Sequence, residues 1–280
     1  EVAPVTASVT ALAEPLDEAP ADDPSDPVAS TLAWTMAATT RRNAVADYQI
    51  GVCTQSSAAC TYIMGPSGVP IPTQNYVQTV MDYYVLPNNP GIDYTAQTVF
   101  TPEGAYPVTG IKVLPLTISA EQGQTILEDT VEILQPGLGE TVVPITFFGF
   151  SQSAVITSLL QRDLATDPTV LPGVDRDEIN FVTVGQEMNP NGGWFSRYPG
   201  LNAASLGEYF FGSTPEDAFP TVNYTLEYDG FADSPRYPLN FLSSVNAAMG
   251  ILLVHINYGN PNYFKNVYGE TDTMYTDGPG

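Results

Sequence analysis

A serine in a short turn that begins with glycine is the first feature that could do chemistry. Ser151 lies in GFSQS (149–153), between the apolar run 142–149 and the segment 153–165. The apolar run predicts a buried strand, and the segment after it has helical spacing. A serine on a sharp strand-to-helix turn is typical of a nucleophile elbow, which needs small residues on either side. We therefore predict that Ser151 is a nucleophile, although Ser153 replaces the commoner second glycine. The alternative is a plain turn.

The same turn predicts an oxyanion hole. The backbone N–H of Gln152 is expected at a helix N-terminus, where the helix dipole favours negative charge. A second donor should come from an earlier strand-to-helix loop. GPSG (65–68) follows an apolar strand, and Pro66 has no N–H, so the backbone of Ser67 is the candidate. The alternative is that this loop is an ordinary Gly/Pro turn.

A serine nucleophile needs a base, and the chain contains one histidine, His255. Hydrolases with a nucleophile elbow have the chain order Ser, acid, His. Asp229 and Asp233 both lie in the required interval. The acid holds the imidazole in the correct tautomer, and a carboxylate at the end of a strand is the better fixed. We therefore prefer Asp229 and keep Asp233 as the alternative, and either carboxylate could instead cap the adjacent turn.

Around these residues, predicted strands and helices alternate along the chain. The pattern predicts strands at 59–64, 95–100, 142–149, 179–185 and 221–229, and helices at 73–85, 119–134, 153–165 and 238–254. Ser119 with Gln122 three residues later forms a capping-box pattern at the start of the second helix. This alternation predicts an α/β fold, with a mostly parallel sheet covered by helices on both faces.

A long aromatic segment, residues 186–220, interrupts the alternation. Its candidate ligand-binding side chains are Trp194, Phe195, Phe210 and Phe211, set among glycines and prolines. Long irregular insertions are often lids or binding walls. We expect these four rings to bind substrate. The alternative is an excursion that covers the core and has no ligand.

The charge balance excludes one class of partner and indicates a compartment. The chain has 31 acidic and 8 basic residues, for a net charge of −23, which repels nucleic acid. Residues 1–32 are acidic and proline-rich, so we expect a disordered arm before a domain at 33–280. Eighteen consecutive apolar residues do not occur, so no transmembrane segment is expected. We expect a secreted or cell-envelope protein whose signal or anchor was removed before Glu1.

The two cysteines, Cys53 and Cys60, are close in sequence. In an exported protein they predict a disulfide, which would stabilise the fold by roughly 2.5 kcal/mol in the chain-entropy model. The alternative is two buried thiols. With one histidine and no other cysteine pair, a metal site is not expected.

Several blocks of the sequence resemble the PE-PPE domain of mycobacterial and related actinobacterial proteins, a cutinase-like branch of the α/β-hydrolases. These blocks are MGPSGVPIPTQNYVQTV, TPEGAYPVTG, SAEQGQTILEDTV, GFSQSA and YDGFADSPRYPLNFLSSVNAAMGILLVHINY, between residues 58 and 259. GPSG departs from the family's commoner Gly-Gly-Thr-Gly. The resemblance implies an α/β-hydrolase fold with Ser151 as nucleophile, His255 as base and the acid in the YDGFADSP block.

The resemblance also implies an activity. Exported relatives of this kind include acyltransferases of trehalose-based glycolipids, and others are esterases of short and medium acyl chains. We expect transfer of acyl groups from lipid esters to a sugar through an acyl-serine, with no metal or organic cofactor and with peripheral envelope association. Ester hydrolysis is the first alternative, and an inactive lipid-binding envelope protein is the second.

Overall fold

A six-stranded parallel sheet forms the centre of the protein. The computed structural model describes residues 48–89, 91–135, 143–237 and 239–259, so the predicted acidic arm, residues 1–32, lies outside the described residues. The strands are β1 (Tyr48–Ile50), β2 (Ala59–Ile63), β3 (Tyr94–Thr98), β4 (Ile145–Phe150), β5 (Ile179–Val184) and β8 (Thr221–Tyr224). Their order is β1-β3-β2-β4-β5-β8, and every neighbouring pair is parallel.

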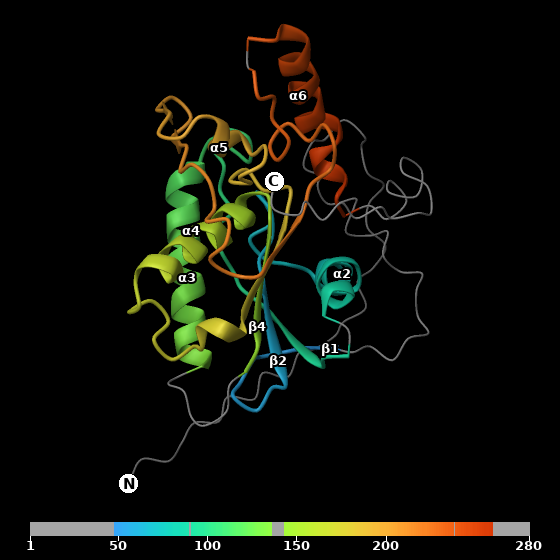
Figure 1. Ribbon diagram of the computed structural model, residues 1–280, viewed down its shortest axis with the longest axis vertical. Coiled ribbons are helices and arrows are strands. Elements are labelled where there is room, and N and C mark those ends of the chain that lie inside the picture. Colours follow the sequence, from blue (N-terminus) through green and yellow to red (C-terminus); the bar gives the residue numbers. More distant parts are fainter. Residues whose placement is uncertain (1–47, 90, 136–142, 238, 260–280) are drawn as a thin grey trace.

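Helices cover both faces of this sheet (Figure 1). Helix α2 (Gln74–Val80) continues as a π-helix, η2 (Met81–Val85), on one face, and α3 (Leu116–Leu134) and α4 (Gln152–Thr166) pack together on the other. The segment between β5 and β8 contains α5 (Trp194–Arg197) and a two-stranded hairpin of β6 (Asn202–Ala203) and β7 (Glu208–Tyr209). Helix α6 (Phe241–Leu253) and the 3-10 turn η5 (His255–Asn257) follow β8. Short 3-10 turns occur at Leu86–Asn88 (η3) and Arg176–Glu178 (η4).

Burial on both faces explains why the central strands are apolar throughout. Successive residues of a strand point to opposite faces. Phe147 and Phe181 therefore belong to the core on the α3–α4 side, where their rings stack at 5.4 Å. Phe148 and Val182, the next residue of each strand, belong to the core under α2.

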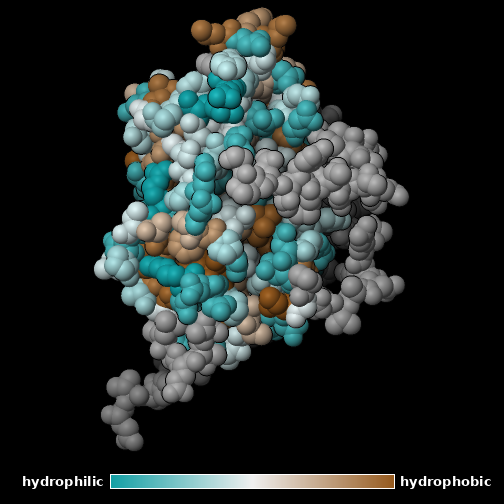
Figure 2. Space-filling view, viewed as in Figure 1, coloured by the Kyte–Doolittle hydropathy of each residue, from teal (hydrophilic) through white to brown (hydrophobic). Residues whose placement is uncertain are grey.

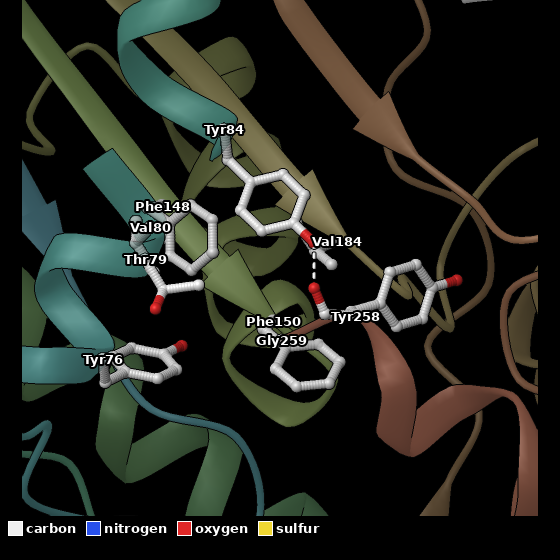
Figure 3. Close-up of a pocket in the computed structure, with 9 residues that line it drawn as sticks. All are labelled: Tyr76, Thr79, Val80, Tyr84, Phe148, Phe150, Val184, Tyr258 and Gly259. Atoms are coloured by element: carbon white, nitrogen blue, oxygen red, sulfur yellow. Dashed lines mark hydrogen bonds between the residues drawn. The ribbon is translucent and has the colours of Figure 1, made fainter. Parts of the chain in front are cut away.

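A small cavity lies in the core on the α2 side (Figure 3). Its lining includes Tyr76, Tyr84, Phe148, Phe150 and Tyr258. Its volume is about 10 Å³, which is near the least that holds one water molecule. This cavity is a packing gap behind the sheet and is too small for an acyl chain.

Two of the predicted element boundaries that differ from the structure bear on the site. Helix α3 begins at Leu116, after Pro115, and not at Ser119. Ser119 does not cap the helix, because its buried hydroxyl accepts hydrogen bonds from the backbone N–H of Gly104 and from Nε2 of Gln152. Strand β8 ends at Tyr224, so the segment up to residue 229 is a turn and not a strand.

Cys53 and Cys60 are both fully buried thiols in the structure, and the predicted disulfide is not formed. The Cys53 thiol donates to the carbonyl oxygen of Thr95 at 3.2 Å. The Cys60 sulfur accepts from Nε2 of Gln135 at 3.6 Å. Both sulfur atoms therefore have polar partners within the α3–α4 core.

The architecture confirms the predicted fold class. Parallel strands joined by helices on both faces, with a sharp strand-to-helix turn at the end of a central strand, form an α/β-hydrolase fold. Within the described part of the chain, the helices are all too short or too polar to cross a membrane.

Candidate active site

Ser151 occupies a strained turn between β4 and α4. Its backbone has φ 55° and ψ −122°, a conformation that costs a non-glycine residue about 1–3 kcal/mol. A Cβ atom on Gly149 would lie 2.3 Å from the carbonyl oxygen of Ser153, so only glycine fits there. The Ser153 hydroxyl accepts a hydrogen bond from the Phe150 N–H at 2.8 Å. The turn thus holds the Ser151 hydroxyl at the carboxyl end of the sheet.

His255 lies next to this hydroxyl. It opens η5, directly after α6, and its Nε2 is 2.8 Å from Oγ of Ser151. Gly185, at the end of β5, has φ 56°, and a Cβ there would lie 2.9 Å from Cε1 of His255. The rings of Phe150 and Phe231 pack against the imidazole at centroid distances of 5.5 and 4.8 Å. These contacts fix the orientation of the ring.

Of the two candidate acids, Asp229 is the one beside His255. Its carboxylate oxygens lie 2.8 and 3.0 Å from Nδ1 of His255. It also accepts from the Phe231 N–H at 3.0 Å and from the Tyr258 hydroxyl at 2.6 Å. Asp233 instead accepts from the Tyr228 N–H at 3.0 Å and caps the turn. The structure thus places Asp229, the preferred candidate, beside His255. Asp229 follows a turn, however, and does not lie at the end of a strand as predicted.

Electrostatics favour an ionised acid and a readily protonated base. Burial raises the pKa of Asp229. The charge and hydrogen bond of His255, with the hydrogen bonds from Tyr258 and the Phe231 N–H, outweigh burial and hold this pKa below its usual value. Burial lowers the pKa of His255, but Asp229 and then Glu187 reverse this and hold it above 6.5. The site therefore stabilises the imidazolium that forms when a histidine removes a serine proton.

Of the two predicted oxyanion donors, Gln152 is the first residue of α4 and Ser67 lies in the loop 65–68. The Ser67 hydroxyl donates to Oε1 of Gln152 at 2.8 Å, and Nε2 of Gln152 donates to the Ser119 hydroxyl at 2.7 Å. These bonds hold the loop 65–68 against the first turn of α4. The side-chain bond brings Ser67 beside Gln152, the residue that follows Ser151. The backbone N–H groups of Gln152 and Ser67 stay the predicted oxyanion donors.

The aromatic insertion is largely part of the core. Phe195 and Phe210 are each 1% exposed and pack on the α3–α4 side, so they fill the interior and do not form an open binding wall. Trp194 and Phe211 are partly exposed and pack against the same core. The Trp194 ring also packs against Phe231, at 5.5 Å. Only Trp194 and Phe211 of the four remain candidates for substrate contact.

Two residues of the site were not predicted from the sequence. Tyr258 donates to Asp229, and its own hydroxyl accepts from the Leu226 N–H at 2.8 Å. Oε1 of Glu187 is 3.3 Å from Oγ of Ser151, and burial raises the pKa of Glu187 to about 7. Glu187 lies three residues after the end of β5, and the carboxyl ends of parallel strands are where site residues gather. That position was the available signal.

Comparisons with known proteins agree with these observations. The model of the PE-PPE domain family matches residues 91–276. The PPE family protein PPE28 of Mycobacterium tuberculosis is 44% identical over 211 residues, 74% of this chain and 30% of that protein. Esterase PE16 of the same organism is 40% identical over 204 residues, 72% and 37% of the two chains. The SL1278 acyltransferase Chp1, also from that organism, is 28% identical over 153 residues, which are 55% of this chain and 35% of that protein.

This chain spans about a third of the length of those relatives. Among solved structures, lysin B from Mycobacteriophage D29 superimposes with a TM-score of 0.43 at 17% identity, covering 70% of this chain and 74% of that one.

Proposed function

The chain belongs to the PE-PPE domain family, and we propose that it is a serine enzyme of acyl esters that works through an acyl-serine at Ser151. The observation that carries the proposal is the continuous hydrogen-bonded series from Ser151 Oγ through His255 to Asp229. Two relatives are named as an esterase and an acyltransferase, which supports the same reaction class.

The geometry supports a two-step mechanism. Nε2 of His255 removes the proton from Ser151 as Oγ attacks the ester carbonyl, and Asp229 stabilises the imidazolium. The N–H groups of Gln152 and Ser67 would bind the tetrahedral oxyanion. The imidazolium then protonates the leaving alcohol, and an acyl-serine remains.

We further propose that the acyl group passes to a sugar hydroxyl, as in a trehalose-type glycolipid, with hydrolysis as the alternative. If the site keeps water away from the acyl-serine, a bound alcohol is favoured over water as acceptor, because the effective molarity of a well-oriented group reaches about 10⁵ M or more. Burial supports this, since Ser151 is 7% exposed and His255 is 6% exposed. A secreted or envelope location, with peripheral envelope association, fits such a substrate and belongs to the same proposal.

Mass spectrometry after incubation with lipid esters tests the mechanism. We expect an acyl adduct on Ser151, and product analysis with trehalose present should give more acylated sugar than free acid. Rapid formation of free acid without acylated sugar would favour the esterase. The absence of any adduct would favour the inactive lipid-binding protein.

Helix α6 supports a lipid substrate, because its apolar side faces outward. Its inner side is made of small residues: a Cβ on Gly250 would lie 1.7 Å from the carbonyl oxygen of Tyr228. The outer side carries exposed apolar residues, which are Phe241, Leu242, Val245, Met249, Leu252 and Leu253. Helix α6 projects from the body of the protein in Figure 1, and Figure 2 shows apolar surface at that end of the molecule. The helix has no charged residue and leads directly to His255.

Polar replacement of this surface should separate lipid substrates from soluble ones. For the double variant Leu242→Ser and Leu252→Ser, we expect turnover of an emulsified long-chain ester to fall roughly tenfold or more, because each leucine that leaves water contributes about 1.5–3 kcal/mol. Turnover of soluble p-nitrophenyl acetate should stay unchanged. Ile133→Ser is the matched control, since Ile133 is 73% exposed on α3. Equal losses on both substrates would contradict this role of α6.

A further inference from the structure

Glu187 is a buried carboxyl group for which the mechanism above has no use. It is 3% exposed, and its Oε1 is 3.3 Å from Oγ of Ser151. Its second oxygen, Oε2, is buried without a hydrogen-bond partner among the described residues. A buried carboxyl oxygen without a partner costs free energy. An unsatisfied acceptor beside the nucleophile therefore needs an explanation.

The Ser151 hydroxyl cannot satisfy an ionised Glu187 and activate the nucleophile at the same time. A serine hydroxyl has one hydrogen, and the mechanism requires that it be donated to Nε2 of His255. Glu187 can then bond to Oγ only when Glu187 itself carries a proton. As a carboxylate, it competes with His255 for the hydrogen of the Ser151 hydroxyl. Once Ser151 is acylated, Oγ has no hydrogen at all. In the acyl-enzyme, both oxygens of an ionised Glu187 are free to accept hydrogen bonds.

We propose that Glu187 binds the acceptor of the acyl group and selects alcohols with two neighbouring hydroxyl groups. This proposal rests on the acyl-serine mechanism above. One hydroxyl of a vicinal diol would face His255, and the neighbouring hydroxyl would donate to the Glu187 carboxylate. Sugars offer many such pairs, whereas a simple alcohol offers one hydroxyl group.

The transfer step balances without a further reactant. Nε2 of His255 takes the proton of the acceptor hydroxyl while the oxygen of that hydroxyl bonds to the acyl carbon. The bond between that carbon and Oγ of Ser151 then breaks, and the imidazolium returns the proton to Oγ. Glu187 gains and loses no proton. It contributes a hydrogen bond to a charged acceptor, which is roughly twice as strong as a neutral one.

A partition experiment tests this role. The enzyme is acylated with p-nitrophenyl butyrate, and the burst of p-nitrophenol reports acylation of Ser151. With 1,2-propanediol or 1-propanol as acceptor, the ratio of new ester to free butyrate reports transfer. We expect the wild type to prefer the diol about tenfold, and Glu187→Gln to reduce that preference to near one. The preference is a ratio of products formed from the acylated enzyme, so it is compared between variants whatever the size of their burst. Glu187→Asp keeps the charge on a shorter side chain and should give an intermediate preference.

Glu208→Gln is the matched control. Glu208, in β7, also has a buried carboxyl oxygen without a hydrogen-bond partner among the described residues, and burial raises its pKa too. This variant should keep the full preference for the diol. Equal transfer to both alcohols by the wild type, or an unchanged preference in Glu187→Gln, would overturn the proposal. A wild type that turns over the ester but forms no acyl adduct on Ser151 by mass spectrometry would instead overturn the acyl-serine mechanism, and this role with it.

Discussion

Replacement of Ser151 by alanine is expected to lower kcat for ester turnover on the order of 10⁶-fold, the loss found when a triad serine is removed. The reason is that His255 and Asp229 then have no nucleophile to activate. Labelling by a fluorophosphonate probe should disappear as well. The fold should survive, because alanine needs no partner and leaves the strained turn, with its φ of 55°, as it is. Turnover, probe labelling and thermal unfolding of the variant measure these outcomes.

The neighbouring serine provides the control. Ser153 is also buried, but its hydroxyl bonds to the backbone of Phe150. Ser153→Ala should keep probe labelling, with some loss of stability. Full labelling of the Ser151→Ala protein would show that the nucleophile is elsewhere.

Asp229→Asn is expected to lower kcat by about 10⁴-fold, as when the acid of a serine triad becomes an amide. An amide at this position can present its NH₂ group to Nδ1 of His255 and so favour the wrong tautomer. It also removes the charge that holds the pKa of His255 above 6.5. Steady-state kinetics over a pH range measure both effects. The acidic limb of kcat/KM should move to lower pH in the variant, because His255 then loses its proton more easily.

Asp233→Asn separates this role from a structural one. Asp233 accepts a hydrogen bond from the Tyr228 N–H in the same turn, and an asparagine oxygen can accept the same bond. We expect a loss of less than about tenfold, in line with a single neutral hydrogen bond. A larger loss for Asp233→Asn than for Asp229→Asn would move the acid to Asp233.

The features that depend on local pattern could be predicted from the sequence alone. Strand and helix periodicity predicted the parallel sheet and most of its covering helices. The elbow at Ser151 was visible because its glycine and small residues are neighbours in the chain. A single histidine left His255 as the one possible base. These inferences need no knowledge of what packs against what.

Features that depend on residues far apart in the chain could not be predicted before the fold was known. Asp229 and Asp233 differ only in which carboxylate the turn directs toward His255. The partners of Ser119 are Gly104 and Gln152, so a pattern that resembles a helix cap is instead part of a buried network.

The places of the aromatic rings and of Glu187 also depend on packing between distant segments. Phe195 and Phe210 pack in the core because the insertion folds back over α3 and α4. Glu187 reaches Ser151 because β4 and β5 end side by side in the sheet. Local sequence sets which conformations a segment prefers, but only the packed sheet brings distant carboxylates, hydroxyl groups and rings within hydrogen-bonding distance.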